Sequence, residues 1–460
     1  MKSRTQKRYL LIYSIPMLLA TSCSSFLNEK SDQKLAVPST LRDFQALMEN
    51  STYIHHAGPS EGEVSSDDYY LTTSDWMNLG YVTDRNTYVW AEAIEFTDKV
   101  QSGWTTGYRT IYYCNSVLEG LSKFDDEVKK STESQNIAGQ AHFFRGNSLF
   151  DIAQIWTKPY EIETANTSLG LPLRLNSDFN QKVERSNLTD TYEQIIGDIK
   201  KAISFLPIES GSKWRPSKAG AYGLLARIYL AMREYEEAGK YADSCLNLYS
   251  SIIDYNSLDL TSNVPIPPNN DEVISYRSMS TVDPIRVTMS KIDTTLYGLY
   301  HDNDLRRRAF FRFRDDGTIR YQGSYLGTTG FFNGIATNEI YLIKAESLAR
   351  QGNIEQATSV MDKLLTNRYK KIDNQTTWTG ASFDTNEKLI DFILLERRKE
   401  LVMRGLRWID VRRLNSEGRK INLRRVIDGK DYDLPAGDNR FALPIPADVI
   451  RISGIEQNDR

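Results

Sequence analysis

The chain has 460 residues with a formal net charge of −3 at pH 7, and it contains 26 tyrosines but only three cysteines and four histidines. This length can bury the core of one large domain or of two to three ordinary ones. The near-neutral charge excludes the basic field that nucleic-acid binding needs, and the lack of Gly- or Pro-rich repeats excludes collagen-like and disordered classes. Because Cys23, Cys114 and Cys245 are far apart, neither a structural zinc site nor a disulfide framework is predicted.

Residues 1–22 have the pattern of a lipoprotein signal peptide. Basic residues are followed by an apolar run at 9–20, which is shorter than the ~20 residues that cross a bilayer. Small residues then lead to Cys23, as in a bacterial lipobox, where the thiol receives diacylglycerol and becomes the mature N-terminus. The alternative is an ordinary signal peptide with an incidental cysteine. No later segment is apolar enough to span a membrane, so attachment is expected through lipid at Cys23 alone.

The rest of the chain is predicted to be mostly α-helical. Apolar residues recur at helical spacing over several long stretches, and helix punctuation agrees, since Thr189 and Asp190 open one stretch and Pro207 ends it. Cys114 and Cys245 fall inside such stretches, which favours buried free thiols over a disulfide. The stretches are 104–121, 137–156, 188–206, 218–230, 235–249, 338–350, 354–368 and 386–403.

Two pairs of these helices resemble tetratricopeptide repeats. The interval from Ala226 to Ala238 equals that from Ala345 to Ala357, and small residues at this interval let two antiparallel helices approach closely. Neither copy has the usual Trp-Leu-Gly start. The other helices would supply the remaining members of a stack, since a stack needs about three repeats to bury its faces.

Two segments between the helices have a different character. Residues 51–97 and 250–333 are rich in Tyr, Asn, Asp, Ser and Gly and show weak periodicity. Long loops within a compact domain are uncommon and are usually functional. We therefore predict one domain over 23–460, with a helical-repeat scaffold at about 104–249 and 338–414 and a large irregular, loop-rich ligand-binding region formed by these two inserts.

Short motifs occur along nearly the whole chain in an order typical of one protein family. They are Phe26-Leu27 after the lipobox; Trp104 with Tyr108, Ile111, Tyr112 and Asn115; AHFFR at 141–145 with Trp156 and Pro159; RSNLTDTY at 185–192 with Asp198, Leu206 and Pro207; Lys218-Ala219 with ARIYL at 226–230; EIYLIKAE at 339–346; ERR at 396–398 with Glu400 and Leu401; Gly405, Arg407, Trp408 and Asp410; LPIP at 443–446; and QND at 457–459. Together they resemble the SusD/RagB family of outer-membrane nutrient-binding lipoproteins of Bacteroidetes. One departure is Arg404, which stands where an acidic residue is common.

The resemblance implies binding rather than catalysis. Members lie on the cell surface, anchored in the outer membrane by lipid, over a TonB-dependent β-barrel transporter of the SusC type. They capture oligosaccharides, or peptides in some branches, and deliver them to the barrel. The helical repeats would face the barrel and the irregular region would hold the ligand. A peptide-binding protein of the RagB kind and a structural helical-repeat adaptor remain the alternatives.

Aromatic side chains in the two inserts are the candidate ligand-binding residues. Sugars present flat C–H faces that stack on Tyr or Trp, while Asn and Asp read their hydroxyl groups. The alternative is that these rings pack the loops onto the scaffold. The candidates are Tyr70, Trp76, Asn78 and Tyr81, with Asp67, Asp68 and Tyr69 beside them, and then Tyr297 and Tyr325, with Tyr300 and Tyr321 as further members of the second cluster.

Charged motifs elsewhere are interpreted as structural. The arginines of the 396–413 block are expected to pair with its carboxylates rather than to bind an anion, with Gly405 as a helix C-cap. Residues 305–308 (LRRR) are expected to form a solvated face. His55-His56 lacks further ligands at metal-binding spacing, and residues 302–304 miss the calcium-loop pattern, so no metal site is predicted.

No catalytic motif or cofactor motif is present. The sequence has no nucleophile elbow, Cys-His signature or phosphate-binding loop. The acid pairs Asp67-Asp68 and Asp315-Asp316 do not by themselves define the carboxyl separation of about 5–9.5 Å that glycoside hydrolysis requires. The sequence therefore predicts a binding protein without a cofactor, and it leaves the sugar, its linkage and its length open.

Overall fold

The computed structural model describes residues 38–92 and 102–460. The chain divides into two compact units, Met1–Thr40 and Leu41–Arg460, and the second unit contains all the elements described below. The predicted signal peptide and the predicted lipidation site at Cys23 lie outside the described residues. No helix in the described ranges is both long and apolar enough to span a membrane.

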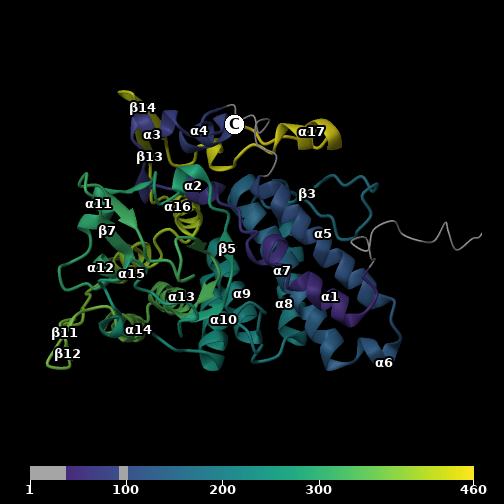
Figure 1. Cartoon of the computed structure of the whole chain (residues 1–460), viewed down its shortest axis with the longest axis horizontal. Helices are drawn as coiled ribbons and strands as arrows, with labels where there is room; N and C mark the ends of the chain where they lie inside the picture. Colours follow the sequence, from purple (N-terminus) through teal and green to yellow (C-terminus); the bar gives the residue numbers. More distant parts are fainter. Residues whose placement is uncertain (1–37, 93–101) are drawn as a thin grey trace, which may run out of the picture. The chain divides into compact units, whose positions relative to one another are not determined.

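Stacked helices form the scaffold of this unit, as Figure 1 shows. Helix α5 packs on α7, α7 on α8, α8 on α9, α9 on α10, α10 on α13, and α13 on both α14 and α15. The mostly α-helical, repeat-like fold predicted from the sequence is thereby confirmed. These helices are α5 (Gly103–Ser122), α7 (Thr132–Trp156), α8 (Leu188–Phe205), α9 (Lys218–Met232), α10 (Tyr235–Leu248), α13 (Thr337–Arg350), α14 (Ile354–Leu365) and α15 (Asn386–Glu400).

Small residues line the seams of the two repeat-like helix pairs. Ala226, Ala238, Ala345 and Ala357 are all fully buried. Between the pairs, α10 and α13 approach so closely that a Cβ added to Gly239 would lie 2.2 Å from the hydroxyl oxygen of Ser347. The small-residue spacing in the sequence therefore marks true helix-helix contacts.

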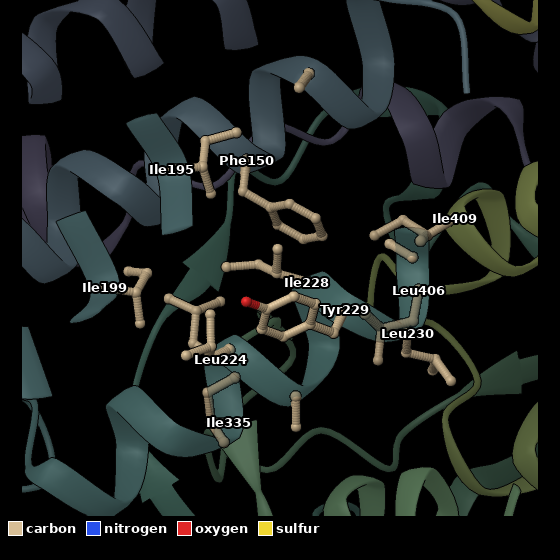
Figure 2. Close-up of a cluster of buried hydrophobic side chains, with 14 of the residues drawn as sticks. Phe150, Ile195, Ile199, Leu224, Ile228, Tyr229, Leu230, Ile335, Leu406 and Ile409 are labelled. Carbon is tan, nitrogen blue, oxygen red and sulfur yellow. The ribbon is translucent and has the colours of Figure 1, made fainter. Parts of the chain in front are cut away.

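The scaffold core is built from apolar faces of several helices, and Figure 2 shows its central part. Phe150 of α7, Ile195 of α8 and Ile228 of α9 meet there, and all are fully buried. The free thiols of Cys114 and Cys245 also lie in this core, as predicted. Burial of such side chains is the main favourable contribution to folding. The inserts have a second core of their own, which contains Tyr69, Tyr300, Tyr321 and Tyr325 among others.

The first insert is more helical than the sequence predicts. Its described part consists of one- to two-turn elements, too short for an apolar period to be readable. Local caps hold them, as in α3, where Thr72 and Asp75 form a reciprocal capping box. The elements from α1 onward are α1 (Leu41–Met48), the π-helical turn η2 (Ser51–His55), α2 (Glu61–Ser65), β1 (Tyr69–Tyr70), α3 (Thr73–Met77) and α4 (Val82–Tyr88).

The second insert is irregular, as predicted, with short antiparallel strand pairs. Strands β4 and β10, β5 and β9, and β7 and β8 pair within it or at its edge. Strand β6 pairs instead with β1 of the first insert, so the two inserts join. Its elements are η3 (Tyr255–Ser257), β4 (Val273–Ser275), β5 (Ser278–Met279), η4 (Asp283–Ile285), β6 (Lys291–Ile292), α11 (Thr294–Gly298), α12 (Arg306–Phe310), β7 (Phe311–Phe313), β8 (Ile319–Tyr321), β9 (Phe331–Phe332) and β10 (Ile335–Ala336).

The remaining elements connect the scaffold or follow it. A hairpin of β13 and β14 lies beside α3 in Figure 1, and the Asp428 N–H at its turn donates to the Thr73 hydroxyl at 2.8 Å. These elements are α6 (Asp126–Lys129), β2 (Leu169–Pro172), β3 (Arg185–Asn187), β11 (Lys371–Ile372), β12 (Gln375–Thr376), α16 (Arg407–Ser416), β13 (Leu423–Ile427), β14 (Lys430–Leu434), η5 (Asn439–Phe441) and α17 (Ala447–Ser453).

Candidate functional site

The two predicted aromatic clusters lie on segments that the fold joins. Tyr70 of β1 is paired with Lys291 of β6 in an antiparallel ladder. The Lys291 ammonium also reaches Asp75 of α3, with 2.5 Å between Nζ and Oδ2. Because α11 follows β6 directly, the segment that carries Tyr297 is attached to the segment that carries Trp76 and Tyr81. The two inserts therefore form one continuous region.

The connection from α3 to α4 presents the most accessible of the predicted ligand-binding residues. Asn78 caps the C-terminal end of α3 and is exposed, and Tyr81 at the start of α4 is 44% exposed. Met77 at 54% and Val82 at 48% add apolar surface beside them. We call these four residues, 77, 78, 81 and 82, the α3–α4 ridge. It combines an aromatic ring, an amide and apolar atoms, which is the chemistry that a sugar or an extended peptide can use.

Trp76 of α3 and Tyr70 of β1 are half-buried. The Trp76 ring packs against the insert core, and its Nε1–H donates to the Arg85 carbonyl oxygen at 3.0 Å. A Trp held in this way has a fixed orientation and part of its surface still reaches solvent. Tyr70 is likewise only partly covered. Neither side chain is thus a wholly exposed platform for a ligand.

Tyr297 belongs to a second aromatic patch, on α11 and β7. Its half-buried ring meets Phe313 edge-to-face with 5.5 Å between the centroids, and the Arg307 guanidinium lies 4.7 Å from the ring centre. Phe313 is 58% exposed. An exposed ring pair with a cation over one face can hold a flat ligand.

Tyr325 does not occupy a ligand-accessible position. It is 2% exposed, and its hydroxyl group is enclosed by Glu272, by Tyr255 at 3.0 Å and by the Asn338 amide at 3.0 Å. Tyr300 and Tyr321 are buried as well, and the Tyr300 hydroxyl donates to the Lys399 carbonyl oxygen at 2.7 Å. Tyr300 and Tyr325 thus tie the insert to the scaffold through Lys399 and Asn338, whereas Tyr321 packs within the insert. The prediction of Tyr325 as a ligand-binding residue is therefore wrong, because its ring is buried.

The acid pair next to the ridge is held by arginines. Asp67 Oδ1 lies 2.7 Å from Arg407 Nε, and Asp68 Oδ1 lies 2.9 Å from Arg398 Nε. Burial by itself would raise the pKa of Asp67, but the charges and hydrogen bonds of Arg407 and Arg398 outweigh it and hold that pKa well below its usual value. Asp67 and Asp68 therefore act as structural anchors for the first insert.

The prediction of internal ion pairing in the 396–413 block is confirmed for Arg397 and Arg413 only, because Arg398 and Arg407 pair with Asp67 and Asp68 of the first insert and, within the described ranges, Arg404 and Arg412 bind no carboxylate. Arg397 binds Asp410, and Arg413 binds both Asp410 and Glu346, at distances of 2.7 to 2.9 Å. Gly405 is not the C-cap of α15, which ends at Glu400. It lies in the connection to α16 with φ of +73°, and its N–H donates to Glu63 at 2.7 Å.

The prediction of a solvated face at 305–308 is wrong for Arg306. This side chain is fully buried, and its guanidinium binds Asp304, Glu396 and Glu400 at 2.6 to 3.0 Å. Two of these carboxylates come from α15, far away in the sequence. No local pattern could have revealed them.

Family models match most of the described chain. Residues 25–230 match a model described as starch-binding and associating with the outer membrane, and residues 336–458 match the SusD family model. The chain belongs to the SusD family. Its curated relatives include a SusD-like protein of Bacteroides ovatus, 24% identical over 273 residues, which are 56% of this chain and 46% of that protein. A SusD-like protein of Formosa agariphila is 24% identical over 148 residues, covering 32% and 27% of the two chains. The matches thus span less than half of these relatives' lengths.

Solved structures of SusD relatives share the fold. A SusD superfamily protein from Bacteroides thetaiotaomicron aligns with a TM-score of 0.73 at 22% identity, over 92% of this chain and all of that one. A putative sugar binding protein from Bacteroides vulgatus aligns with a TM-score of 0.70 at 20% identity, over 92% and 99% of the two chains. At this identity the likeness concerns the fold.

Two aromatic cavities of this SusD-family chain were not predicted from its sequence. One, of about 480 Å³, is lined by Tyr112 and Tyr113 of α5 and by Phe179, which is 72% exposed and stacks on Tyr112 at 4.6 Å. The other, of about 570 Å³, is lined by His55, His56 and Trp214, among others. The tyrosines on one face of α5 were a readable signal, whereas the loop that brings Phe179 to them was not. Within the described ranges, no group of His, Cys, Asp and Glu could hold a metal ion.

Proposed function

We propose that this SusD-family chain is a lipid-anchored protein of the cell surface that binds oligosaccharide and delivers it to a SusC-type TonB-dependent transporter. The observation that carries the proposal is the α3–α4 ridge, where exposed Tyr81 and Asn78 stand beside half-buried Trp76 on the joined inserts. A ring that stacks on the C–H face of a sugar and an amide that reads its hydroxyl groups are the minimum of a glycan subsite.

The relatives support glycan over peptide. The model that matches residues 25–230 is described as starch-binding, and solved neighbours from Bacteroides vulgatus are described as a putative sugar binding protein and as a SusD-like carbohydrate binding protein. Binding without catalysis is further supported by the Asp67-Asp68 pair, since both carboxylates are engaged by arginines and neither is placed to act on a substrate.

The site is tested with a glycan array followed by calorimetry. The purified chain is screened against glycans and peptides, and the best ligand is titrated into wild type, Tyr81→Ala and Tyr81→Phe. Truncating a stacked anchor costs about 2 kcal/mol, or roughly a 30-fold loss of affinity, and Tyr81→Phe keeps the ring and most of the affinity. Because Tyr81 is 44% exposed, the melting temperatures of both Tyr81 variants are expected to stay near that of wild type.

Phe179→Ala is the matched control. It also removes an exposed ring, but at the α5 cavity, and it leaves affinity unchanged if the ridge is the site. A loss in Phe179→Ala and none in Tyr81→Ala moves the glycan site to α5. Saturable binding of peptides and of no glycan contradicts the proposed ligand class.

A further inference from the structure

Arg412 of α16 differs from most of the buried arginines in the described ranges, and Arg404 and Arg425, which also bind no carboxylate there, lie over aromatic rings instead. Its neighbours Arg397 and Arg413 bind Asp410 or Glu346, and Arg306 and Arg368 bind carboxylates as well. Arg412 is 3% exposed, yet no Asp or Glu of the described ranges lies within 4.0 Å of its guanidinium. Its Nη2–H donates to the Thr157 carbonyl oxygen at the end of α7. Its Nε and Nη1 are buried and have no hydrogen-bond partner in that part of the chain.

A buried guanidinium without a counter-ion is unusual, because burial disfavours the charged form. Burial accordingly lowers the pKa of Arg412 to about 10, although the nearby Tyr192 acts in the other direction. The partial negative charge at the C-terminal end of α7 offsets some of this penalty through the Thr157 carbonyl. The N–H groups at Nε and Nη1 still lack an acceptor, and a bound anion or water molecule would supply one.

Arg412 also lines a cavity of about 220 Å³ between the end of α7, α16 and the segment before α17. A water molecule takes about 30 Å³ of liquid volume, so this space holds a small ion together with water. The hydroxyl groups of Thr164 and Ser168 and the amide of Asn439 add polar groups to the wall, and Phe441 closes it on an apolar side.

The unpaired charge in this cavity is positive. Glu161 at the wall is bound by Arg233 at 2.7 Å, and Asp438 is bound by Arg440 at 2.7 Å. Lys158, exposed at the rim, forms no ion pair with any residue the structure describes. Lys158 and Arg412 are thus the two cationic groups left to attract a ligand.

We propose that this cavity is an oxyanion site, in which Arg412 and Lys158 bind a small carboxylate, sulfate or phosphate group. The guanidinium of Arg412 is a buried charge without a counter-ion, so an oxyanion beside it would neutralise that charge and accept from an unpartnered N–H, and a lysine at the rim adds a second point charge. The site is separate from the α3–α4 ridge, so its test does not depend on the proposed glycan site.

The test is calorimetric titration of the purified chain with sodium sulfate, sodium phosphate and sodium glucuronate, at constant ionic strength set with sodium chloride. We expect at least one of the three anions to bind saturably at one site. Preference for glucuronate would indicate that the site binds the carboxylate of a sugar, whereas preference for sulfate or phosphate would indicate an inorganic oxyanion. Arg412→Met weakens that binding at least 10-fold. Absence of saturable binding by all three, or equal binding by Arg412→Met, overturns the proposal.

Two further variants distinguish a local loss of anion binding from effects of net charge and of misfolding. Arg424→Met removes one positive charge from the exposed β13–β14 hairpin and leaves binding unchanged. Lys158→Gln alters only an exposed side chain and weakens binding about 3- to 10-fold, so it decides the question if Arg412→Met does not fold. A 10-fold loss in Arg424→Met would mean that the effect is one of net charge, which also overturns the site.

Discussion

Buried charge ties the inserts of this protein to its scaffold, side chain by side chain. Arg306 of α12 binds Glu396 and Glu400 of α15, and Arg368 links Glu400 to Glu272 of the second insert at 2.6 Å. Removing one partner from such a network leaves an uncompensated buried charge, which is strongly destabilising. These pairs therefore specify where the inserts sit, in addition to the apolar packing below them.

The buried carboxyl group of Glu63 in α2 joins the first insert to the connection before α16. Glu63 is buried and accepts the Gly405 N–H at 2.7 Å and the Ser66 hydroxyl at 3.2 Å. Burial, with the nearby Asp68 charge, raises the pKa of Glu63 to about 8, although these hydrogen bonds act in the other direction. At neutral pH the folded protein thus holds a proton here that the unfolded chain has already released.

This proton makes stability depend on pH. The pKa of the unfolded group is about 4.3, so between about pH 4.5 and 8 the unfolded state gains by ionisation and the folded state does not. The Glu63 contribution to the free energy of unfolding therefore falls as pH rises through this window, by on the order of 1 kcal/mol per pH unit. Glu63→Gln removes the contribution and keeps an acceptor for Gly405.

Urea unfolding of wild type and Glu63→Gln at pH 5, 6.5 and 8 measures the effect. We expect the stability of the variant relative to wild type to increase steadily with pH. Other titrating groups are common to both proteins and cancel in the difference. Parallel stability curves for the two proteins would show that Glu63 ionises normally in the folded state.

The close approach of two scaffold helices restricts which side chains fit between them. At the contact of α10 and α13, the Ser347 hydroxyl donates to the Tyr235 carbonyl oxygen and leaves no room for a side chain on Gly239. A methyl group there would overlap Ser347 unless the helices separate. Overpacking of this kind typically destabilises by about 1–3 kcal/mol.

Gly239→Ala is therefore expected to lower the free energy of unfolding by about 1–3 kcal/mol, despite the better helix propensity of alanine. Gly197→Ala is the matched control, because Gly197 is inside α8 and a Cβ there would meet nothing within 4 Å. That change should stabilise by about 0.5–1 kcal/mol. Chemical denaturation of both variants measures the difference, and a stabilised Gly239→Ala would refute the close contact.

At the scale of the whole protein, the predicted lipid anchor is the first feature to test. Radiolabelled fatty acid fed to expressing cells should label wild type and not Cys23→Ala, because Cys23 follows the predicted signal peptide. Cys114→Ala is the control and should keep the label, since Cys114 is a buried thiol of the scaffold core. Equal labelling of wild type and Cys23→Ala would show that Cys23 is not the site of lipidation.

The proposed transporter partner is the second whole-molecule prediction. Affinity purification of the tagged protein in mild detergent should recover a large plugged β-barrel of the outer membrane. An unrelated tagged lipoprotein from the same cells is the control for non-specific recovery. Recovery of the SusD-family chain without a barrel protein, under conditions in which other barrel complexes stay intact, would contradict the delivery role.

The scaffold was predictable from the sequence because its information is local. Helices such as α7 and α8 run for several turns, so their apolar period and their caps are readable within one segment. The equal Ala226–Ala238 and Ala345–Ala357 intervals also marked real helix contacts, since a close approach demands small residues wherever it occurs. Most of the family motifs lie in these same segments.

Only the tertiary structure decided which polar and aromatic side chains face solvent. Tyr81 and Tyr325 are equivalent as loop tyrosines in the sequence, but one is 44% exposed and the other 2% exposed. Arg412 and Arg413 are neighbours on one helix, but Glu346 of α13 pairs with Arg413, and Arg412 opens onto a cavity instead. The partners that separate such residues come from distant segments, so their burial and charge balance are properties of the packed fold.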